Sequence, residues 1–161
     1  MGKTLRAALL LGLTLLLSTP PAQAAGTRFT WPLAPPHPVL RPFSPPSTPY
    51  GSGHRGVDLG GAVGEQVVAA GDGTVVFAGD LAGRPLVSVE HAGGLRTTYE
   101  PVDPVIRAGR QVRRGEPIGT LAAGHEGCAE ACLHWGARRG REYLNPLRLV
   151  SLGRVRLLPV S

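Results

Sequence analysis

The sequence predicts an almost all-β fold, a compact antiparallel sandwich or barrel whose strands are joined by glycine-rich turns. Its 161 residues are enough for one domain with a hydrophobic core and too few for two. Between residues 51 and 150, short apolar runs are separated by glycine turns, as in all-β domains. After the first 24 residues, no segment keeps a helical period over ten residues. These observations favour one β domain over a helical or α/β chain.

Residues 1–24 have the features of an export signal. Two basic residues precede an apolar run over residues 7–17, and the small-residue motif Ala22-Gln23-Ala24 follows two prolines. A membrane-spanning helix needs about 20 apolar residues, which this run does not provide. We therefore expect cleavage after Ala24, no stable membrane anchor, and a monomeric protein that is secreted and associates with the cell wall outside the cell.

Residues 25–50 form a proline-rich segment that contains eight of the sixteen prolines. Proline has no N–H to donate to a sheet, so we expect an extended arm that is not a fold of its own. Its aromatic residues, Phe29, Trp31 and Phe43, would pack on the domain surface. A β domain would follow over residues 51–150, and residues 151–161 would form a tail.

Three strand patterns follow along the predicted domain. Residues 67–70 and 74–78 flank a Gly-Asp-Gly turn, and residues 85–91 and 95–99 flank Ala-Gly-Gly. Residues 109–121 repeat the pattern of short apolar segments around glycine. We expect a hairpin at each of these places.

Charge excludes some classes of function. All basic residues of the expected mature chain are arginines, because the only lysine, Lys3, lies in the signal. With Arg6 also removed, 15 basic and 11 acidic residues remain, a net charge of +4. Such a protein would associate with anionic wall polymers or membrane surfaces through salt-sensitive attraction; alternatively, most of these arginines form a solvated surface. The arginines are scattered, which argues against nucleic acid, and a biotinyl or lipoyl carrier would need an attachment lysine.

The two cysteines predict a local disulfide. Cys128 and Cys132 lie close together in a chain expected to reach an oxidising compartment. A second interpretation remains, because His125, Cys128, Cys132 and His134 have the residue types of a structural zinc site. That site would require reduced thiolates, so export favours the disulfide.

A second set of residues predicts a catalytic zinc site. His54 and Asp58 share one face of an extended chain, and Gly56 between them leaves room for an ion. His134 stands between two apolar residues, as in a strand with two different faces. Two histidines and one carboxylate with an open fourth position are typical of catalytic zinc, whereas calcium and magnesium prefer oxygen ligands. The alternatives are a solvated polar turn and a hydrogen-bonded core histidine.

Four segments together resemble the lysostaphin or LytM type of zinc endopeptidase, the peptidase family M23. They are residues 53–58 (GHRGVD), 68–75 (VAAGDGTV), 89–95 (VEHAGGL) and 133–136 (LHWG). The resemblance covers roughly residues 51–149 in the order of the family. It implies an antiparallel β fold, one zinc ion held by His54, Asp58 and His134, and cleavage of peptide bonds in bacterial peptidoglycan.

The chain departs from the family pattern at the two histidines that usually assist catalysis. Cys132 stands at the first position of the family's His-x-His motif. Pro101 stands where the family has the histidine of Tyr-x-His, after Tyr99. Without assisting groups, a hydrolase typically loses about 10²–10⁴ in rate.

Three nearby residues are candidate substitutes. Glu100 or His125 would act as general base, and Tyr99 would help to hold the oxyanion; alternatively, each is an exposed loop residue. The chain would then be an active wall endopeptidase, or else a zinc-bearing module that binds peptidoglycan or activates a partner hydrolase. A purely structural exported domain is disfavoured by the order of the motifs.

Overall fold

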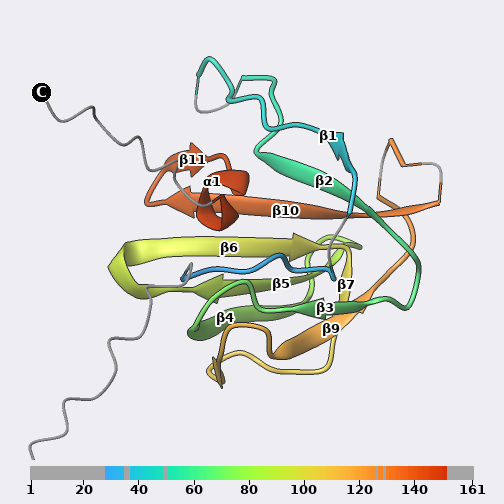
Figure 1. Cartoon of the computed structure of the whole chain (residues 1–161), viewed down its shortest axis with the longest axis vertical. Coiled ribbons are helices and arrows are strands. Elements are labelled where there is room, and N and C mark those ends of the chain that lie inside the picture. The colour runs from blue at the N-terminus through green and yellow to red at the C-terminus, as the bar shows by residue number, and fades with distance from the viewer. Residues whose placement is uncertain (1–27, 35–36, 49–50, 126, 129, 152–161) are drawn as a thin grey trace, which may run out of the picture.

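A computed structural model describes residues 28–34, 37–48, 51–125, 127–128 and 130–151 (Figure 1). The expected signal and nearly all of the expected tail lie outside these residues. The strands are β1 (Val39–Arg41), β2 (Gly56–Gly61), β3 (Gln66–Val68), β4 (Gly73–Asp80), β5 (Pro85–Glu90), β6 (Leu95–Glu100), β7 (Val102–Pro104), β8 (Gln111–Val112), β9 (Pro117–Leu121), β10 (Ala131–Arg139) and β11 (Glu142–Leu144). A 3-10 turn (Ala92–Gly94) and a short helix, α1 (Leu147–Val150), complete the fold.

The strands form two antiparallel sheets, which confirms the predicted fold class. The larger sheet has eight strands in the order β1-β2-β10-β6-β5-β4-β8, with β11 also paired to β10. The smaller sheet has the order β3-β9-β7. The long strand β10 therefore lies between β2 and β6, in the middle of the larger sheet (Figure 1).

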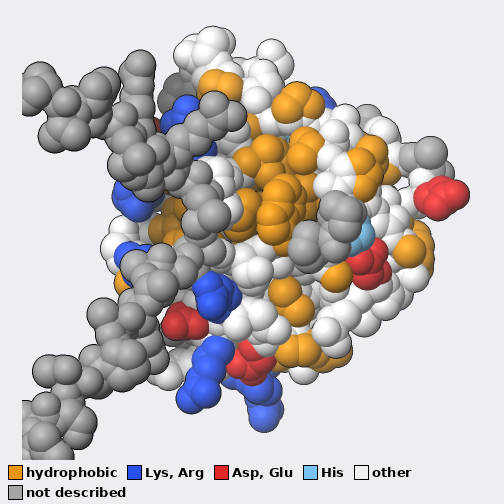
Figure 2. Space-filling model, viewed as in Figure 1, with side chains coloured by type: hydrophobic (Ala, Val, Ile, Leu, Met, Phe, Trp, Pro, Cys, Tyr) orange, Lys and Arg blue, Asp and Glu red, His pale blue; other side chains and the backbone are white. Residues whose placement is uncertain are grey.

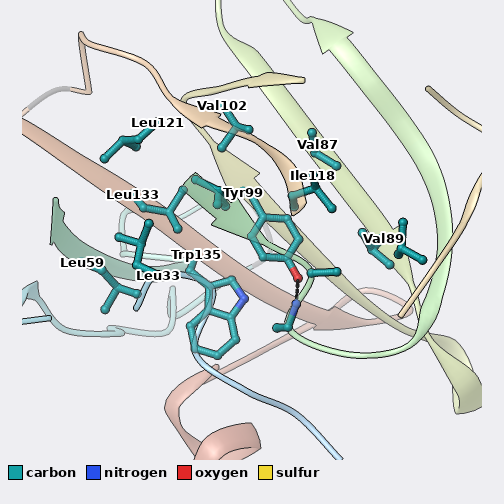
Figure 3. Close-up of a cluster of buried hydrophobic side chains, with 14 of the residues drawn as sticks. Leu33, Leu59, Val87, Val89, Tyr99, Val102, Ile118, Leu121, Leu133 and Trp135 are labelled. Atoms are coloured by element: carbon teal, nitrogen blue, oxygen red, sulfur yellow. Dashed lines mark hydrogen bonds between the residues drawn. The ribbon is translucent and has the colours of Figure 1, made fainter. Parts of the chain in front are cut away.

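The hydrophobic core determines which face of the larger sheet is left for function. Leu59 of β2 and Leu133 and Trp135 of β10 are fully buried and pack in one cluster with residues of the smaller sheet (Figure 3). Side chains alternate along a strand, so their neighbours Asp58 and His134 project from the opposite face. Packing on one face thus aligns two predicted metal ligands on the other.

One predicted hairpin is confirmed and two are wrong. β5 pairs with β6 across a turn in which Gly93 and Gly94 have φ of 75° and 69°, a conformation that favours glycine. By contrast, β3 pairs with β9 and β4 pairs with β5 and β8, so residues 67–78 cross from one sheet to the other. β8 and β9 likewise belong to different sheets. Turn chemistry predicts where the chain reverses, but not which strand it joins afterwards.

The proline-rich arm is part of the fold, which corrects the predicted start of the sheet at residue 51. Strand β1 pairs with β2, and Ser44 forms a β-bridge with His54. Leu33 is 1% exposed and belongs to the core, and the Trp31 ring lies 6.4 Å from that of Trp135. The predicted packing of arm aromatics on the domain is therefore confirmed. Val39–Arg41 contains no proline, so this part of the arm can pair as an edge strand.

The surface carries both signs of charge. On the face shown in Figure 2, arginine and acidic side chains are interspersed around a central group of hydrophobic side chains. No helix among the described residues is long and apolar enough to cross a membrane.

A chain of hydrogen bonds joins the turn between β3 and β4 to strand β6 through His91. The Ala70 N–H donates to Tyr99 Oη over 2.9 Å, and Thr97 Oγ1 lies 2.8 Å from Tyr99 Oη and 2.7 Å from His91 Nε2. His91 Nδ1 lies 2.8 Å from the Asp72 carbonyl oxygen, to which it donates. Its Nε2 must then accept a hydrogen bond from Thr97, so the network is satisfied by a neutral His91.

His91 is expected to lower the free energy of unfolding at acidic pH. Burial lowers its pKa below the ordinary 6.5, against the opposing effect of the Asp72 carbonyl. Unfolding therefore takes up a proton, and this contribution to stability is present above about pH 6.5 and lost as the pH falls below it. In urea unfolding from pH 5 to 8, the free energy of unfolding should fall more steeply with decreasing pH for the wild type than for His91→Gln. Equal pH slopes in both proteins would contradict this.

Candidate metal centre

Two neighbouring strands and a bridge residue two positions ahead of one of them position the three predicted zinc ligands. Asp58 of β2 stands directly opposite His134 of β10 in the antiparallel ladder. His54 precedes β2 and is held by its backbone bridge to Ser44, with hydrogen bonds of 3.0 and 2.7 Å in the two directions. His134 is thus 76 residues from Asp58 and 80 from His54 in sequence, and the pairing of the backbone segments brings them together.

The three side chains converge on one point. His54 Nε2 lies 3.0 Å from Asp58 Oδ1 and 3.0 Å from His134 Nδ1, and the latter lies 2.8 Å from Asp58 Oδ1. Asp58 and His54 are almost fully buried, whereas the His134 side chain is 19% exposed. The site is therefore closed on the protein side and reached from solvent past His134.

The hydrogen bond on the other side of His54 fixes its tautomer. His54 Nδ1 lies 2.8 Å from the Pro42 carbonyl oxygen, which can only accept a hydrogen bond. With the proton on Nδ1, the Nε2 lone pair faces Asp58 and His134. This outer hydrogen bond is what metal-binding histidines commonly make.

The donor set fits a zinc ion. Atoms bound at about 2.0–2.1 Å to one zinc at tetrahedral angles lie about 3.3–3.4 Å apart, so separations of 2.8–3.0 Å need only a small outward shift. Two nitrogens and one carboxylate oxygen suit zinc better than calcium or magnesium. The sequence therefore predicted a set of residues that the fold brings together with the correct chemistry for zinc.

His125 also reaches this site. Its Nε2 lies 3.4 Å from Asp58 Oδ1, and its ring lies 5.5 Å from that of His134. Burial alone would raise the pKa of Asp58, but hydrogen bonds from His125 and His134 and the nearby imidazole charges lower it well below its usual range. The same contact with Asp58 raises the pKa of His125, more than burial lowers it. Of the three substitutes proposed from sequence, His125 is the one whose side chain forms an ion pair with a predicted metal ligand, Asp58.

Comparison with known proteins agrees with this geometry. The family model described as Peptidase family M23 matches residues 52–146, more than half of the chain. The chain belongs to peptidase family M23. This confirms the resemblance to the lysostaphin and LytM type.

The M23 chain is similar to proteins from several bacteria. It is 53% identical over 151 residues to the uncharacterized protein Rv2891 of Mycobacterium tuberculosis, covering 91% of this chain and 61% of that protein. It is 33% identical over 99 residues to the murein hydrolase activator NlpD of Salmonella dublin, covering 60% and 26%. The chain thus spans 61% or less of the length of these curated relatives.

Two solved structures have the same fold. A zinc containing peptidase from Vibrio cholerae superimposes with a TM-score of 0.62 and 22% identity, over 78% of this chain and 40% of that one. Lysostaphin superimposes with a TM-score of 0.60 and 20% identity, over 78% and 57%.

Gly56 makes room for a ligand of the M23 site in a way that the sequence only partly predicted. A Cβ at Gly56 would lie 2.7 Å from His134 Nε2 and 2.5 Å from the Trp135 carbonyl oxygen. The space beside Gly56 is therefore filled by the His134 ring itself.

Gly56→Ala is expected to displace His134 and to weaken zinc binding by about 10-fold or more, as loss of ligand orientation does. A chelator competition assay measures this. Gly64→Ala is no suitable control because Gly64 has a φ of 83°, whereas Gly136→Ala meets only ordinary contacts of 3.6 Å or more. Equal zinc affinity in the Gly56 and Gly136 variants would contradict the expectation.

The predicted disulfide is confirmed and the thiolate zinc site is not formed. Cys128 and Cys132 are bonded to each other. Ligand atoms of Asp58, His125 and Cys132 lie within 4.8 Å of one another, but Cys132 Sγ is committed to the disulfide. The bond ties the segment after His125 to β10, next to His134.

The proposed role of Tyr99 at the metal is wrong. Tyr99 alternates with half-buried residues of β6 and points into the core, where it is fully buried and hydrogen-bonded to Ala70 (Figure 3). Burial raises its pKa to about 12, so its hydroxyl stays protonated. Tyr99 supports the core behind the site.

Tyr99→Phe is therefore expected to lower stability by about 1–3 kcal/mol, because the Ala70 N–H loses its acceptor. Thermal unfolding and zinc binding, measured together, would test this. A variant with wild-type stability and impaired zinc-site chemistry would restore the role at the metal.

A groove beside the metal ligands includes residues that the motifs did not single out. A hollow of about 330 Å³ is lined by His134, Glu100 and four arginines, and a second of about 190 Å³ by Glu100, Pro101 and His125. Glu100 lies opposite His134 in the ladder and pairs with Arg84 over 3.2 Å, so it is placed at the site but already has a cation. The alternation of His134, Gly136 and Arg138 along β10 was the sequence signal for this groove.

Proposed function

We propose that this M23 domain is an exported zinc endopeptidase that cleaves peptide bonds of peptidoglycan. The observation that carries the proposal is the convergence of His54 Nε2, Asp58 Oδ1 and His134 Nδ1 within 3.0 Å of one another at the edge of an open groove. Membership of peptidase family M23 and similarity to a murein hydrolase activator support a role at peptidoglycan. Residues 1–24 support export.

The site residues would hold one zinc ion through two nitrogens and one oxygen. Bound zinc would supply a Lewis acid that polarises the scissile carbonyl and makes water more acidic. Pro42 keeps the proton of His54 on Nδ1, away from the ion. Asp58, ionised through its imidazole contacts, supplies the negative charge that a cation requires.

His125 would replace the assisting histidines that Cys132 and Pro101 displace. Its Nε2 lies 3.4 Å from Asp58 Oδ1, and its side chain lines the hollow beside Glu100. In this role the His125 imidazole, whose Nε2–H faces Asp58 in this structure, would give up that proton and turn to the substrate. Its Nε2 would then accept a proton from the attacking water and pass it to the departing amine, so that the peptide bond breaks and leaves a new carboxylate and a new amine. Cys128, three residues after His125, is joined by the disulfide to Cys132 of β10.

Peptide release from purified sacculi tests the proposal. The mature chain, loaded with zinc, is expected to release peptides with new amino termini that mass spectrometry detects, and His134→Ala is expected to release none. Amino-terminal sequencing of the exported protein would test cleavage after Ala24. Equal release by both proteins would contradict a reaction at this site.

The second candidate is a zinc-bearing module that binds peptidoglycan or activates a partner hydrolase. The similarity to NlpD and the residues Cys132 and Pro101 at the assisting positions favour it. Zinc binding and sacculus binding without any new amino terminus would select this function over the endopeptidase.

A further inference from the structure

The groove next to His134 has a strong excess of positive charge. Four arginines line the hollow of about 330 Å³, against a single glutamate, Glu100. Arg84 is paired with Glu100, and Arg96 is paired over 2.7 Å with Glu90, which does not line the hollow. The wall of the groove therefore has more cationic than anionic groups at the place where a substrate would lie.

Two of these arginines are placed directly against each other. Arg138 of β10 and Arg96 of β6 are partners in the antiparallel ladder, on the same face as His134. Like charges directly opposite each other on neighbouring strands are unfavourable. Arg138 Nη1 donates a hydrogen bond of 2.6 Å to the Gly140 carbonyl oxygen, a neutral acceptor. Arg96 already pairs with Glu90, so an anion bound by Arg138 beside that pair would relieve the remaining repulsion.

The floor of the groove is low enough for a main chain to approach. Gly136 lies opposite Thr98 between the Arg138–Arg96 pair and His134, so the sheet surface carries only small side chains there. Arg55, whose guanidinium lies 5.3 Å from the ring centre of Tyr143, forms another part of the wall. A peptide lying along this floor would have the arginines on its side chains and His134 near its backbone.

We propose that the groove selects peptides with free carboxylates next to the bond at the metal site, and that Arg138 and Arg96 bind one such carboxylate. The guanidinium group offers paired donors that match a carboxylate, and a bidentate pair adds specificity as well as energy. A peptide is favoured over a phosphate polymer because the groove leads directly to His134 of the hydrolytic site. This inference rests on the proposed endopeptidase for its substrate, but the binding step can be tested without turnover.

Two synthetic wall-type peptides of identical sequence, one with free and one with amidated carboxylates, provide the probe. Binding is measured by fluorescence anisotropy on the full mature chain with a chelator present, so that no cleavage occurs. We expect the free acid to bind about 10-fold to 100-fold more tightly, with the difference shrinking as salt is raised. Arg138→Gln should remove most of this discrimination.

Arg107→Gln is the matched control, because Arg107 is exposed and lines a different hollow. Arg138→Gln should fold with an unchanged or higher Tm, since it removes the repulsion with Arg96; a lower Tm with retained discrimination would mean a structural role and overturn the proposal. Equal binding of both peptides, binding of neither, or stronger competition by polyphosphate than by the free acid would also overturn it. If the free acid binds more tightly but neither peptide is cleaved when zinc is present, the groove proposal stands and the endopeptidase is contradicted. If both peptides are cleaved at equal rates, the endopeptidase stands and the groove proposal is contradicted.

Discussion

Asp58→Ala is expected to weaken zinc binding by more than about 100-fold and to reduce peptide release to background. Its Oδ1 lies within 3.0 Å of His54 Nε2 and His134 Nδ1 and 3.4 Å from His125 Nε2. This single oxygen therefore contacts all three histidines of the site. Loss of a partner that only orients a ligand costs about 10-fold to 100-fold in metal affinity, and loss of the ligand itself should cost more. Competition with a chromophoric chelator measures the affinity.

The control for Asp58→Ala is Asp103→Ala, which removes an exposed strand carboxylate of the smaller sheet. Circular dichroism should show that both variants keep the β fold. Zinc affinity within a few-fold of the wild type in the Asp58 variant would mean that the three side chains are not the metal site.

His125→Ala, assayed with saturating zinc, is expected to lower kcat/KM for wall peptides by about 10²–10⁴, whereas zinc affinity falls by at most about 10-fold to 100-fold. The reason is that His125 contacts Asp58 from the groove side but is not among the three converging ligands. Steady-state cleavage of a defined peptide, with zinc content measured on the same sample, separates the two effects.

Glu100→Gln is the companion variant for His125→Ala. Glu100 already pairs with the exposed Arg84, so its loss should change kcat/KM by less than about 10-fold. A wild-type rate in the His125 variant would exclude it as the assisting group, and a large loss in the Glu100 variant alone would assign that role to Glu100.

The metal ligands were predictable because their chemistry is expressed in local patterns. His54 and Asp58 are four residues apart around a glycine, and His134 alternates with buried apolar residues. Alternation on β10 fixed the face of His134 before any pairing was known. No local pattern predicted that β10 pairs with β2, which places His134 opposite Asp58.

Other features depend on contacts that no local pattern contains. The approach of His125 to Asp58 depends on where the residues after β9 lie relative to β2, which no local pattern contains. The carbonyl of Pro42 could not be assigned to His54 because the arm was expected to remain outside the sheet. Tyr99 was misplaced although a signal existed: Leu95, Thr97 and Tyr99 alternate inward along β6.

The most direct test of the zinc endopeptidase is a titration of the metal-stripped protein. After removal of metal with a chelator, zinc is added back stepwise while peptide release from sacculi and the heat of binding are followed on the same preparation. We predict one zinc per chain and a release rate that rises with added zinc and levels off at about one equivalent. Release that persists without metal, or full zinc occupancy with no new amino terminus in the wall peptides, would contradict the account.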